Sequence, residues 1–127
     1  MQKALVVDDA KVIRHLLTAN LADLGYEVTP AVNGKEALEL LDRTPLITLA
    51  MVDWNMPVMS GLDFLKAVRA DPRFSALTVI MVTSETEVDH IVTALEAGAN
   101  DYIMKPFSPE MIAEKLLLLG LLEGQSN

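Results

Sequence analysis

The sequence predicts an α/β fold in which five helices cover a doubly wound, five-stranded parallel sheet with strand order 2-1-3-4-5. Five short apolar runs alternate with five segments in which apolar residues recur at helical spacing. Strands that alternate with helices pair in parallel, and their helices cover both faces of the sheet. The second apolar run, residues 26–29, leads into Pro30, which cannot donate a ladder hydrogen bond. This strand is therefore predicted at an edge of the sheet, its place in the order 2-1-3-4-5.

Capping residues delimit the predicted helices. Asn33 with Glu36, and Ser60 with Asp63, have the spacing of a capping box ahead of an apolar segment. Pro109 suits the first position of the last helix. We expect helices at residues 11–24, after Asn33, after Ser60, at residues 87–97 and from Pro109 towards Leu122.

Length and composition indicate a globular domain. The 127 residues suit one domain, expected at residues 1–124 and followed by a tail at 125–127. With 18 acidic and 10 basic residues the net charge is −8, which disfavours nucleic acid and membranes as partners because both need a basic face. The sequence contains no cysteine, secretion signal or membrane-length apolar run, so we expect a cytoplasmic protein. The short tail favours a complete chain over a piece of a larger regulator.

Polar residues suited to a phosphoryl group follow four of the apolar runs. Asp8 and Asp9 come after the first run, Asp53 after the third, Thr83 after the fourth and Lys105 after the fifth. In an open parallel sheet ligands bind at the carboxyl edge, and the predicted order places strands 1, 3, 4 and 5 side by side. Three carboxylates, a hydroxyl and an ammonium group at one edge predict a magnesium and phosphoryl site.

Five segments of the chain resemble the receiver domains of bacterial two-component response regulators, and together they span essentially the whole sequence. The matching segments are Val7-Asp8-Asp9, Met51-Val52-Asp53-Trp54-Asn55-Met56-Pro57, Gly61, Met81-Val82-Thr83-Ser84 and Tyr102-Ile103-Met104-Lys105-Pro106-Phe107. The resemblance implies a flavodoxin-like fold and a stand-alone response regulator that accepts a phosphoryl group from a histidine kinase or a phosphotransfer protein of a phosphorelay. Residues 53–57 are most similar to the single-domain receivers of chemotaxis, so chemotaxis is the expected pathway.

The resemblance assigns the phosphoryl-accepting role to Asp53, which would form an acyl phosphate. A carboxylate and a phosphorylated donor are both anions, and each like-charge pair costs about 4 kcal/mol at about 4 Å and an effective dielectric constant of about 20. A hard cation removes this penalty, and Mg²⁺ prefers oxygen ligands. The resemblance implies metal contacts from Asp9, Asp53 and the backbone carbonyl of Asn55, with Asp8 acting in the same pocket largely through water. The alternative for Asp8 and Asp9 is a pair of helix N-cap residues.

Lys105 and Thr83 are expected to contact the phosphoryl group. In the family the lysine pairs with the acidic residues at rest and with a phosphoryl oxygen after transfer, and the peptide bond before Pro106 is cis. Thr83 would donate its hydroxyl to a phosphoryl oxygen, and the ring of Tyr102 would follow it inward as a two-state switch. The alternatives are a surface lysine, a β-branched packing residue and an ordinary half-buried tyrosine.

Asn55 and Glu85 stand two residues beyond Asp53 and Thr83. In receivers these positions flank the phosphoryl group and tune how quickly water removes it. The polar and acidic pair found here is similar to that of chemotaxis receivers. We therefore expect a short-lived phosphorylated state.

The last predicted helix carries more leucines than one buried face needs. A helix that is apolar all round is either deeply buried or covered by a partner. In the family, the face formed by the fourth helix, fifth strand and fifth helix binds protein targets and often a second copy. We expect a protein target or a homodimer contact on this face, with a helix tucked into its own core as the alternative. The surplus residues are Leu117, Leu118, Leu121 and Leu122, beside a core-facing stripe of Ile112, Leu116 and Leu119.

Two other functions fit parts of the sequence. A phosphate-independent interaction module of receiver fold would need none of the acidic residues, and here all of them are present. An aspartyl-phosphate phosphatase of the haloacid dehalogenase class would need a second Asp two residues after the nucleophile, where this chain has Asn55. We expect no turnover of a separate substrate, only promotion of the protein's own phosphorylation and dephosphorylation. His15 and His90 fall on helical segments away from the strand ends and are expected to be surface or half-buried residues.

Overall fold

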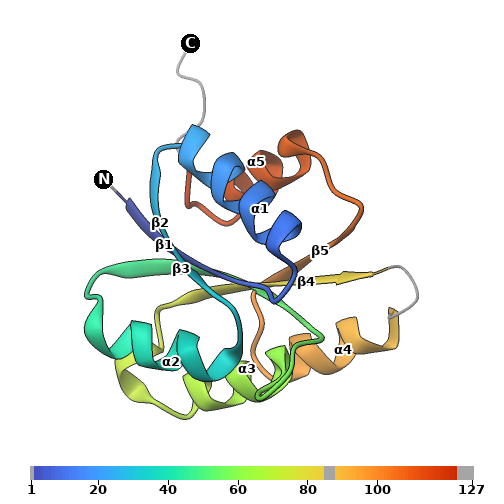
Figure 1. Ribbon diagram of the computed structural model, residues 1–127. Helices are drawn as coiled ribbons and strands as arrows, with labels where there is room; N and C mark the ends of the chain where they lie inside the picture. The colour runs from blue at the N-terminus through green and yellow to red at the C-terminus, as the bar shows by residue number, and fades with distance from the viewer. Residues whose placement is uncertain (1, 85–87, 123–127) are drawn as a thin grey trace.

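A five-stranded parallel sheet with the order β2-β1-β3-β4-β5 forms the centre of the computed structural model, which describes residues 2–84 and 88–122 (Figure 1). The strand order and the parallel pairing confirm the prediction. The elements are β1 (Gln2–Val7), α1 (Lys11–Asp23), β2 (Tyr26–Ala31), α2 (Gly34–Arg43), β3 (Ile47–Asp53), α3 (Gly61–Arg69), the 3-10 turn η1 (Pro72–Phe74), β4 (Thr78–Ser84), α4 (Val88–Glu96), β5 (Asp101–Lys105) and α5 (Pro109–Leu118).

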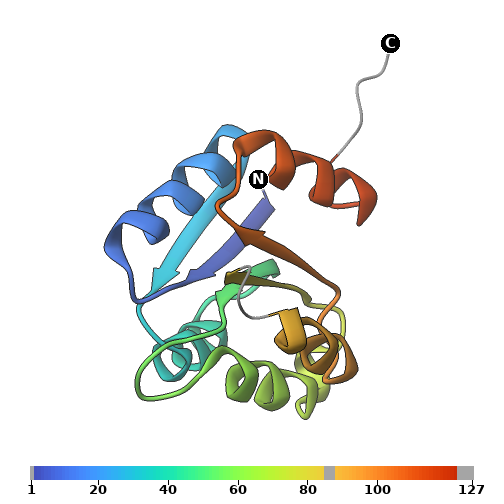
Figure 2. The same cartoon turned by 90° about the vertical axis from the view of Figure 1, so that its right-hand side faces the viewer.

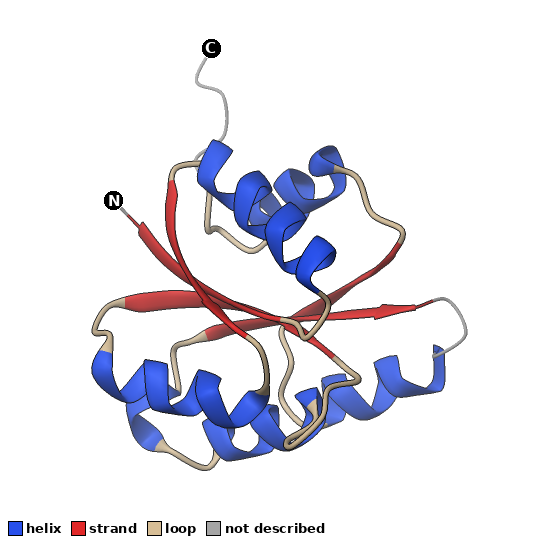
Figure 3. Ribbon diagram, viewed as in Figure 1, coloured by secondary structure: helices blue, strands red, loops and turns tan. Residues whose placement is uncertain are grey.

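Helices cover both faces of the sheet. α1 and α5 lie on one face, and α2, α3 and α4 lie on the other (Figures 1, 2 and 3). Side chains of the inner strands alternate between the two resulting cores. In β1, Leu5 and Val7 pack into the core shared with α2, α3 and α4, whereas Ala4 and Val6 pack into the core shared with α1 and α5. Because both faces are buried, these strands read as continuous apolar runs.

β2 forms an edge of the sheet, as predicted, but it is longer than predicted. It extends to Ala31 rather than ending at residue 29. Pro30 stands opposite Val6 in the register of β1 and β2. Its missing N–H is tolerated because β2 has one neighbouring strand. The proline therefore marks the edge strand without ending it.

Side-chain caps start the helices where the sequence predicts them. Asn33 Oδ1 accepts a hydrogen bond from the backbone N–H of Glu36 at 2.8 Å. Ser60 Oγ accepts one from the backbone N–H of Asp63 at 3.1 Å. α5 begins with Pro109 at its first helical position. These caps fix where the chain leaves the strand-end loops and enters each helix.

α1 begins without a side-chain cap. Its N-cap residue is Ala10, which makes no such hydrogen bond. Asp8 Oδ1 accepts a hydrogen bond from the backbone N–H of Ala10 at 2.8 Å, one residue before the helix starts, and Asp9 is exposed. The interpretation of Asp8 and Asp9 as a helix-capping pair is therefore wrong.

α5 ends at Leu118 and does not continue to residue 122. Leu121 and Leu122 instead pack against the core beneath α1 and α5, and the backbone carbonyl of Leu121 accepts a hydrogen bond from the Tyr26 hydroxyl at 2.7 Å. The surplus of leucines is thus smaller than predicted, since Leu117 and Leu118 remain exposed, at 45% and 73%. None of the described helices is long and apolar enough to cross a membrane.

Arg69, at the end of α3, closes the amino edge of the sheet. Its guanidinium donates hydrogen bonds to the carbonyl of Gly98 at 2.8 Å, to the carbonyl of Phe74 at 3.2 Å and to Asn100 Oδ1 at 2.8 Å. Asn100 Oδ1 also accepts a hydrogen bond from the backbone N–H of Val79 at 2.8 Å. One side chain therefore joins the loops that lead into β4 and β5.

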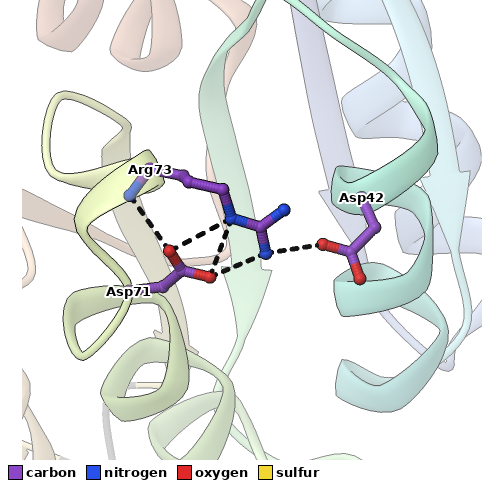
Figure 4. A network of polar contacts seen from close by, with 3 residues as sticks. All are labelled: Asp42, Asp71 and Arg73. Atoms are coloured by element: carbon purple, nitrogen blue, oxygen red, sulfur yellow. Dashed lines mark hydrogen bonds and ion pairs between the residues drawn. The ribbon is translucent and has the colours of Figure 1, made fainter.

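A second arginine joins the turn η1 to α2 at the surface. Arg73 Nη2 lies 2.8 Å from Asp71 Oδ2 and 2.9 Å from Asp42 Oδ1 (Figure 4). The side chains of Arg73 and Asp42 are 63% and 56% exposed. Water and salt screen exposed ion pairs, so we expect this network to contribute little to the free energy of unfolding.

Replacing Gly61 with alanine is expected to destabilise the fold strongly. A Cβ atom there would overlap the backbone carbonyl oxygen of Asp53, so β3 or α3 would have to shift, at a cost of more than about 3 kcal/mol. Gly34→Ala is the matched control, because the three atoms nearest to its Cβ would belong to the side chain of Met59 and not to the backbone, and a methionine side chain adapts more easily. Urea denaturation of both variants measures the difference, and equal stabilities would contradict the prediction.

Candidate functional site

The carboxyl edge of the sheet gathers the buried polar side chains of the described chain. Asp8, Asp53 and Thr83 are 0%, 6% and 2% exposed, and within the described ranges they are the buried residues that are polar or charged. Asp8 follows β1, Asp53 ends β3 and Thr83 lies one residue before the end of β4. Because β1, β3 and β4 are neighbours in the sheet, the topology brings these three residues to one place.

Lys105, the last residue of β5, supplies a positive charge to these carboxylates. Its Nζ donates a hydrogen bond to Asp53 Oδ1 at 3.1 Å. Asp8 Oδ2 lies 3.7 Å from the same Nζ, which is within ion-pair range but too far for a hydrogen bond. In the part of the chain that the structure describes, this buried oxygen has no hydrogen-bond partner. A buried carboxylate oxygen in that position favours a cation or a water molecule beside it.

Burial shifts the pKa values of all three charged groups. Burial, together with the charge of Asp8, raises the pKa of Asp53 to about 6 against the opposing hydrogen bond from Lys105. Burial also raises the pKa of Asp8. Burial alone would lower the pKa of Lys105, but its hydrogen bond with Asp53 and the charges of both carboxylates outweigh burial and raise it. One ammonium group therefore compensates the carboxylates only in part.

Three carboxylates are placed to hold a metal ion. Asp8, Asp9 and Asp53 each offer an oxygen atom, and these atoms lie within 4.8 Å of one another. Asp9 is exposed, so water reaches the cluster from that side. The oxygen donors, and the Oδ2 of Asp8 that lacks a hydrogen-bond partner, fit a hard cation such as Mg²⁺, which binds one or two carboxylates and retains several water ligands.

The backbone after Asp53 is held close to the site. The N–H of Trp54 donates to the carbonyl of Val82 at 3.2 Å, and the carbonyl of Trp54 accepts from the N–H of Gly61 at 3.0 Å. The indole of Trp54 stacks on the imidazole of His90, with ring centroids 4.3 Å apart and planes at 12°. His90 is half-buried as predicted, but it is not remote from the strand ends. It lies in the first turn of α4, shortly after β4 ends.

Thr83 and Tyr102 lie on the two strands β4 and β5, which are adjacent. Thr83 is buried, and Tyr102 is half-buried three positions before Lys105. The Nζ atom of Lys115 lies 5.0 Å from the centre of the Tyr102 ring and 3.0 Å from Asp101 Oδ1. The tyrosine therefore has a cationic neighbour from α5 that the sequence did not indicate.

The two remaining predicted site residues are Asn55 and Glu85. Asn55 is exposed in the loop between β3 and α3, two residues beyond Asp53. Glu85 lies outside the described residues, and its role stays a prediction. The peptide bond between Lys105 and Pro106 is cis, as the family resemblance implied.

Replacing Asp53 with asparagine is expected to stabilise the protein at pH 7 in the absence of divalent cations. The folded protein holds the Asp53 proton more tightly than the unfolded chain, because the pKa rises from 3.8 to about 6 on folding. The unfolding free energy of the wild type should therefore fall as the pH rises through this window, by up to about 3 kcal/mol. Asp53→Asn removes this decline, and Asp23→Asn, an exposed control, retains it. Urea denaturation between pH 4 and 7 tests this, and parallel curves for wild type and Asp53→Asn would contradict it.

Comparison with known proteins identifies the family. The family model of the response regulator receiver domain matches residues 4–117. Chemotaxis protein CheY1 of Helicobacter pylori strain J99 is 48% identical over 120 residues, which cover 93% of this chain and 97% of the relative. Chemotaxis protein CheY of Pseudomonas aeruginosa is 43% identical and is covered to 92%, against 90% of this chain. The structure of chemotaxis protein CheY4 of Vibrio cholerae matches with a TM-score of 0.86 at 36% identity, covering 93% of this chain and 98% of that one. The chain therefore belongs to the response regulator receiver domains, of the CheY type that serves two-component signalling in chemotaxis.

Proposed function

We propose that this chain is a phosphoryl-accepting switch of chemotaxis signalling. Asp53 takes a phosphoryl group from a histidine kinase or a phosphotransfer protein when Mg²⁺ is bound, and the modification changes affinity for a protein partner. The observation that carries the proposal is the convergence of Asp8, Asp53 and Thr83, the buried polar residues of the described chain, beside Lys105 at the edge of the sheet. The chemotaxis proteins among its relatives support the pathway.

Phosphoryl transfer to Asp53 would join two anions. A carboxylate oxygen of Asp53 forms the new bond to phosphorus, and the bond from phosphorus to the donor's imidazole nitrogen breaks, with its electron pair going to that nitrogen. The ammonium group of Lys105, 3.1 Å from Asp53 Oδ1, lies where it can neutralise a phosphoryl oxygen after transfer. Fixed charge in a partly buried site needs no reorganisation during the reaction.

Mg²⁺ would be held by Asp8, Asp9 and Asp53, with the backbone carbonyl of Asn55 as a further ligand. When bound, it supplies the positive charge that a carboxylate and an incoming phosphoryl group both need. The support for this metal is the cluster of three carboxylates within 4.8 Å and the buried Oδ2 of Asp8, which has no hydrogen-bond partner. The hydrogen bond from the backbone N–H of Ala10 fixes the other oxygen of this carboxylate, Oδ1.

Thr83 and Tyr102 would form the switch. The buried hydroxyl of Thr83 donates to a phosphoryl oxygen on Asp53, and the ring of Tyr102 on the adjacent strand moves with it. Phosphorylation thereby shifts an equilibrium between two arrangements. Asn55 and Glu85 would flank the phosphoryl group and set how fast water removes it, so the protein turns over its own modification and no separate substrate.

The face formed by α4, β5 and α5 would bind the protein target or a second copy of the chain. Val92, Leu95 and Leu118 on this face are 61%, 45% and 73% exposed. Exposed apolar side chains on these two helices support a protein contact there. A cavity of about 250 Å³ also opens beside the switch tyrosine, lined by Tyr102, Ile103, Met104, Met111, Glu114 and Lys115.

Incubation with acetyl phosphate is expected to add one phosphoryl group to the wild-type protein, and intact mass spectrometry measures it. Labelling should require Mg²⁺ and should fall at least 100-fold in Asp53→Asn, because the variant lacks the nucleophile. Asp23→Asn, on an exposed part of α1, is the control and should label like the wild type. Labelling of Asp53→Asn at the wild-type rate would refute the assignment.

Replacing Asp8 with asparagine is expected to weaken Mg²⁺ binding by about 10- to 100-fold, the range found when groups around a metal site are altered. The variant keeps the size of the side chain but removes the negative charge of the buried carboxylate. Isothermal titration calorimetry measures the affinity, with Asp63→Asn on the exposed start of α3 as control. An unchanged affinity in Asp8→Asn would place the metal elsewhere.

A further inference from the structure

The contact between Trp54 and His90 joins the phosphoacceptor loop to α4. The two rings are nearly parallel, at 12°, with centroids 4.3 Å apart. The indole is 9% exposed, so water is largely excluded from the contact. Aromatic pairs of this kind change an equilibrium by about 2- to 13-fold beyond the effect of their buried area. The stack is therefore strong enough to influence both the loop after Asp53 and α4.

At one end of the contact, Trp54 cannot move independently of the phosphoacceptor. It directly follows Asp53, and its backbone is bonded on both sides, to Val82 at 3.2 Å and to Gly61 at 3.0 Å. Gly61 in turn lies so close to the Asp53 carbonyl that a Cβ atom would overlap it. The indole is therefore carried by a backbone that is held in place beside Asp53.

At the other end, residues 89–96 of α4 bury fewer large apolar side chains than α3 does. Its buried side chain in the described residues is Ala94, while Val92 and Leu95 are 61% and 45% exposed. α3, on the same face of the sheet, buries Phe64, Leu65 and Val68. Because residues 89–96 bury little apolar area, the position of this part of α4 depends on individual contacts.

The carboxyl end of α4 is held by hydrogen bonds, so a movement of this helix would pivot about that end. The carbonyl of Gly98 accepts a hydrogen bond from Arg69 at 2.8 Å, and the N–H of Ala99 donates to the carbonyl of Ala94 at 3.0 Å. His90 lies near the opposite end of the helix. A pivot about the Arg69 contact would move His90 more than any residue near Gly98.

We propose that His90 is a positioning residue that couples the phosphoacceptor loop to α4 through Trp54. This proposal rests on the proposed function, because it takes Asp53 as the site where Mg²⁺ and the phosphoryl group bind. Mg²⁺ binding fixes the backbone from Asp53 to Asn55, the stack transmits this to α4, and the exposed Val92 and Leu95 are held in one position. Such coupling is reciprocal: if Mg²⁺ binding stabilises one position of α4 through the stack, the stack strengthens Mg²⁺ binding by the same factor. Loss of the stack therefore weakens Mg²⁺ binding by that factor.

Mg²⁺ affinity and amide hydrogen exchange of residues 89–96 test the coupling in wild type, His90→Ala and His90→Phe. His90→Ala should bind Mg²⁺ about 2- to 13-fold more weakly and lose the slowing of exchange that Mg²⁺ causes in α4. His90→Phe keeps an aromatic ring and should restore both. His15→Ala, which removes the exposed histidine of α1, is the matched control and should behave like the wild type. Wild-type Mg²⁺ affinity in His90→Ala, or no rescue by His90→Phe, would overturn the proposal.

A double-mutant cycle of Asp53→Asn and His90→Ala decides the coupling without metal or phosphoryl transfer. Asp53→Asn should change exchange in α4 when His90 is present and should have little effect when it is replaced. Additive effects of the two substitutions would overturn the coupling. If Asp53 failed to accept a phosphoryl group while the cycle stayed non-additive, the proposed function would fall and the coupling would stand.

Discussion

The pairing of Lys105 with Asp53, and at longer range with Asp8, is the interaction on which the arrangement of the site depends. One ammonium group faces a cluster of three carboxylates, and two of them are buried. Burying charge without full compensation is unfavourable. The fold tolerates it because Asp8 and Asp53, the two buried carboxylates, stand at the ends of β1 and β3, whose apolar residues are buried on both faces of the sheet. The free energy gained by burying the apolar strands thus offsets the unfavourable excess of negative charge in the site.

The fold could be predicted because its signals are local. The alternation of apolar runs and helical segments gave the parallel sheet, and the caps at Asn33 and Ser60 gave two helix starts. The errors occurred where tertiary contacts decide. β2 continues through Pro30 because an edge strand needs no second neighbour. The chain after α5 turns back because Leu121 meets the hydroxyl of Tyr26, a residue far away in the sequence.

The site was predictable to the extent that topology determines it. Residues at strand ends meet whenever the strands are neighbours, so Asp8, Asp53 and Lys105 could be grouped from their positions alone. Contacts that depend on the orientation of a helix on the sheet could not be predicted in this way. The stack of His90 on Trp54 depends on the placement of α4 on the sheet, for which the sequence gives spacing but no angle.

Arg69 makes the amino edge of the sheet different from the carboxyl edge. It ties the loops before β4 and β5 together through neutral carbonyl and amide groups, far from the charged edge. The clamped end can then act as a fulcrum and α4 as a lever arm. The helix has nine residues, so it is about 13 Å long, and a tilt of about 5° moves its far end by about 1 Å. In the proposed pivot, a shift of this size beside Asp53 would move the first turns of α4 by a similar distance.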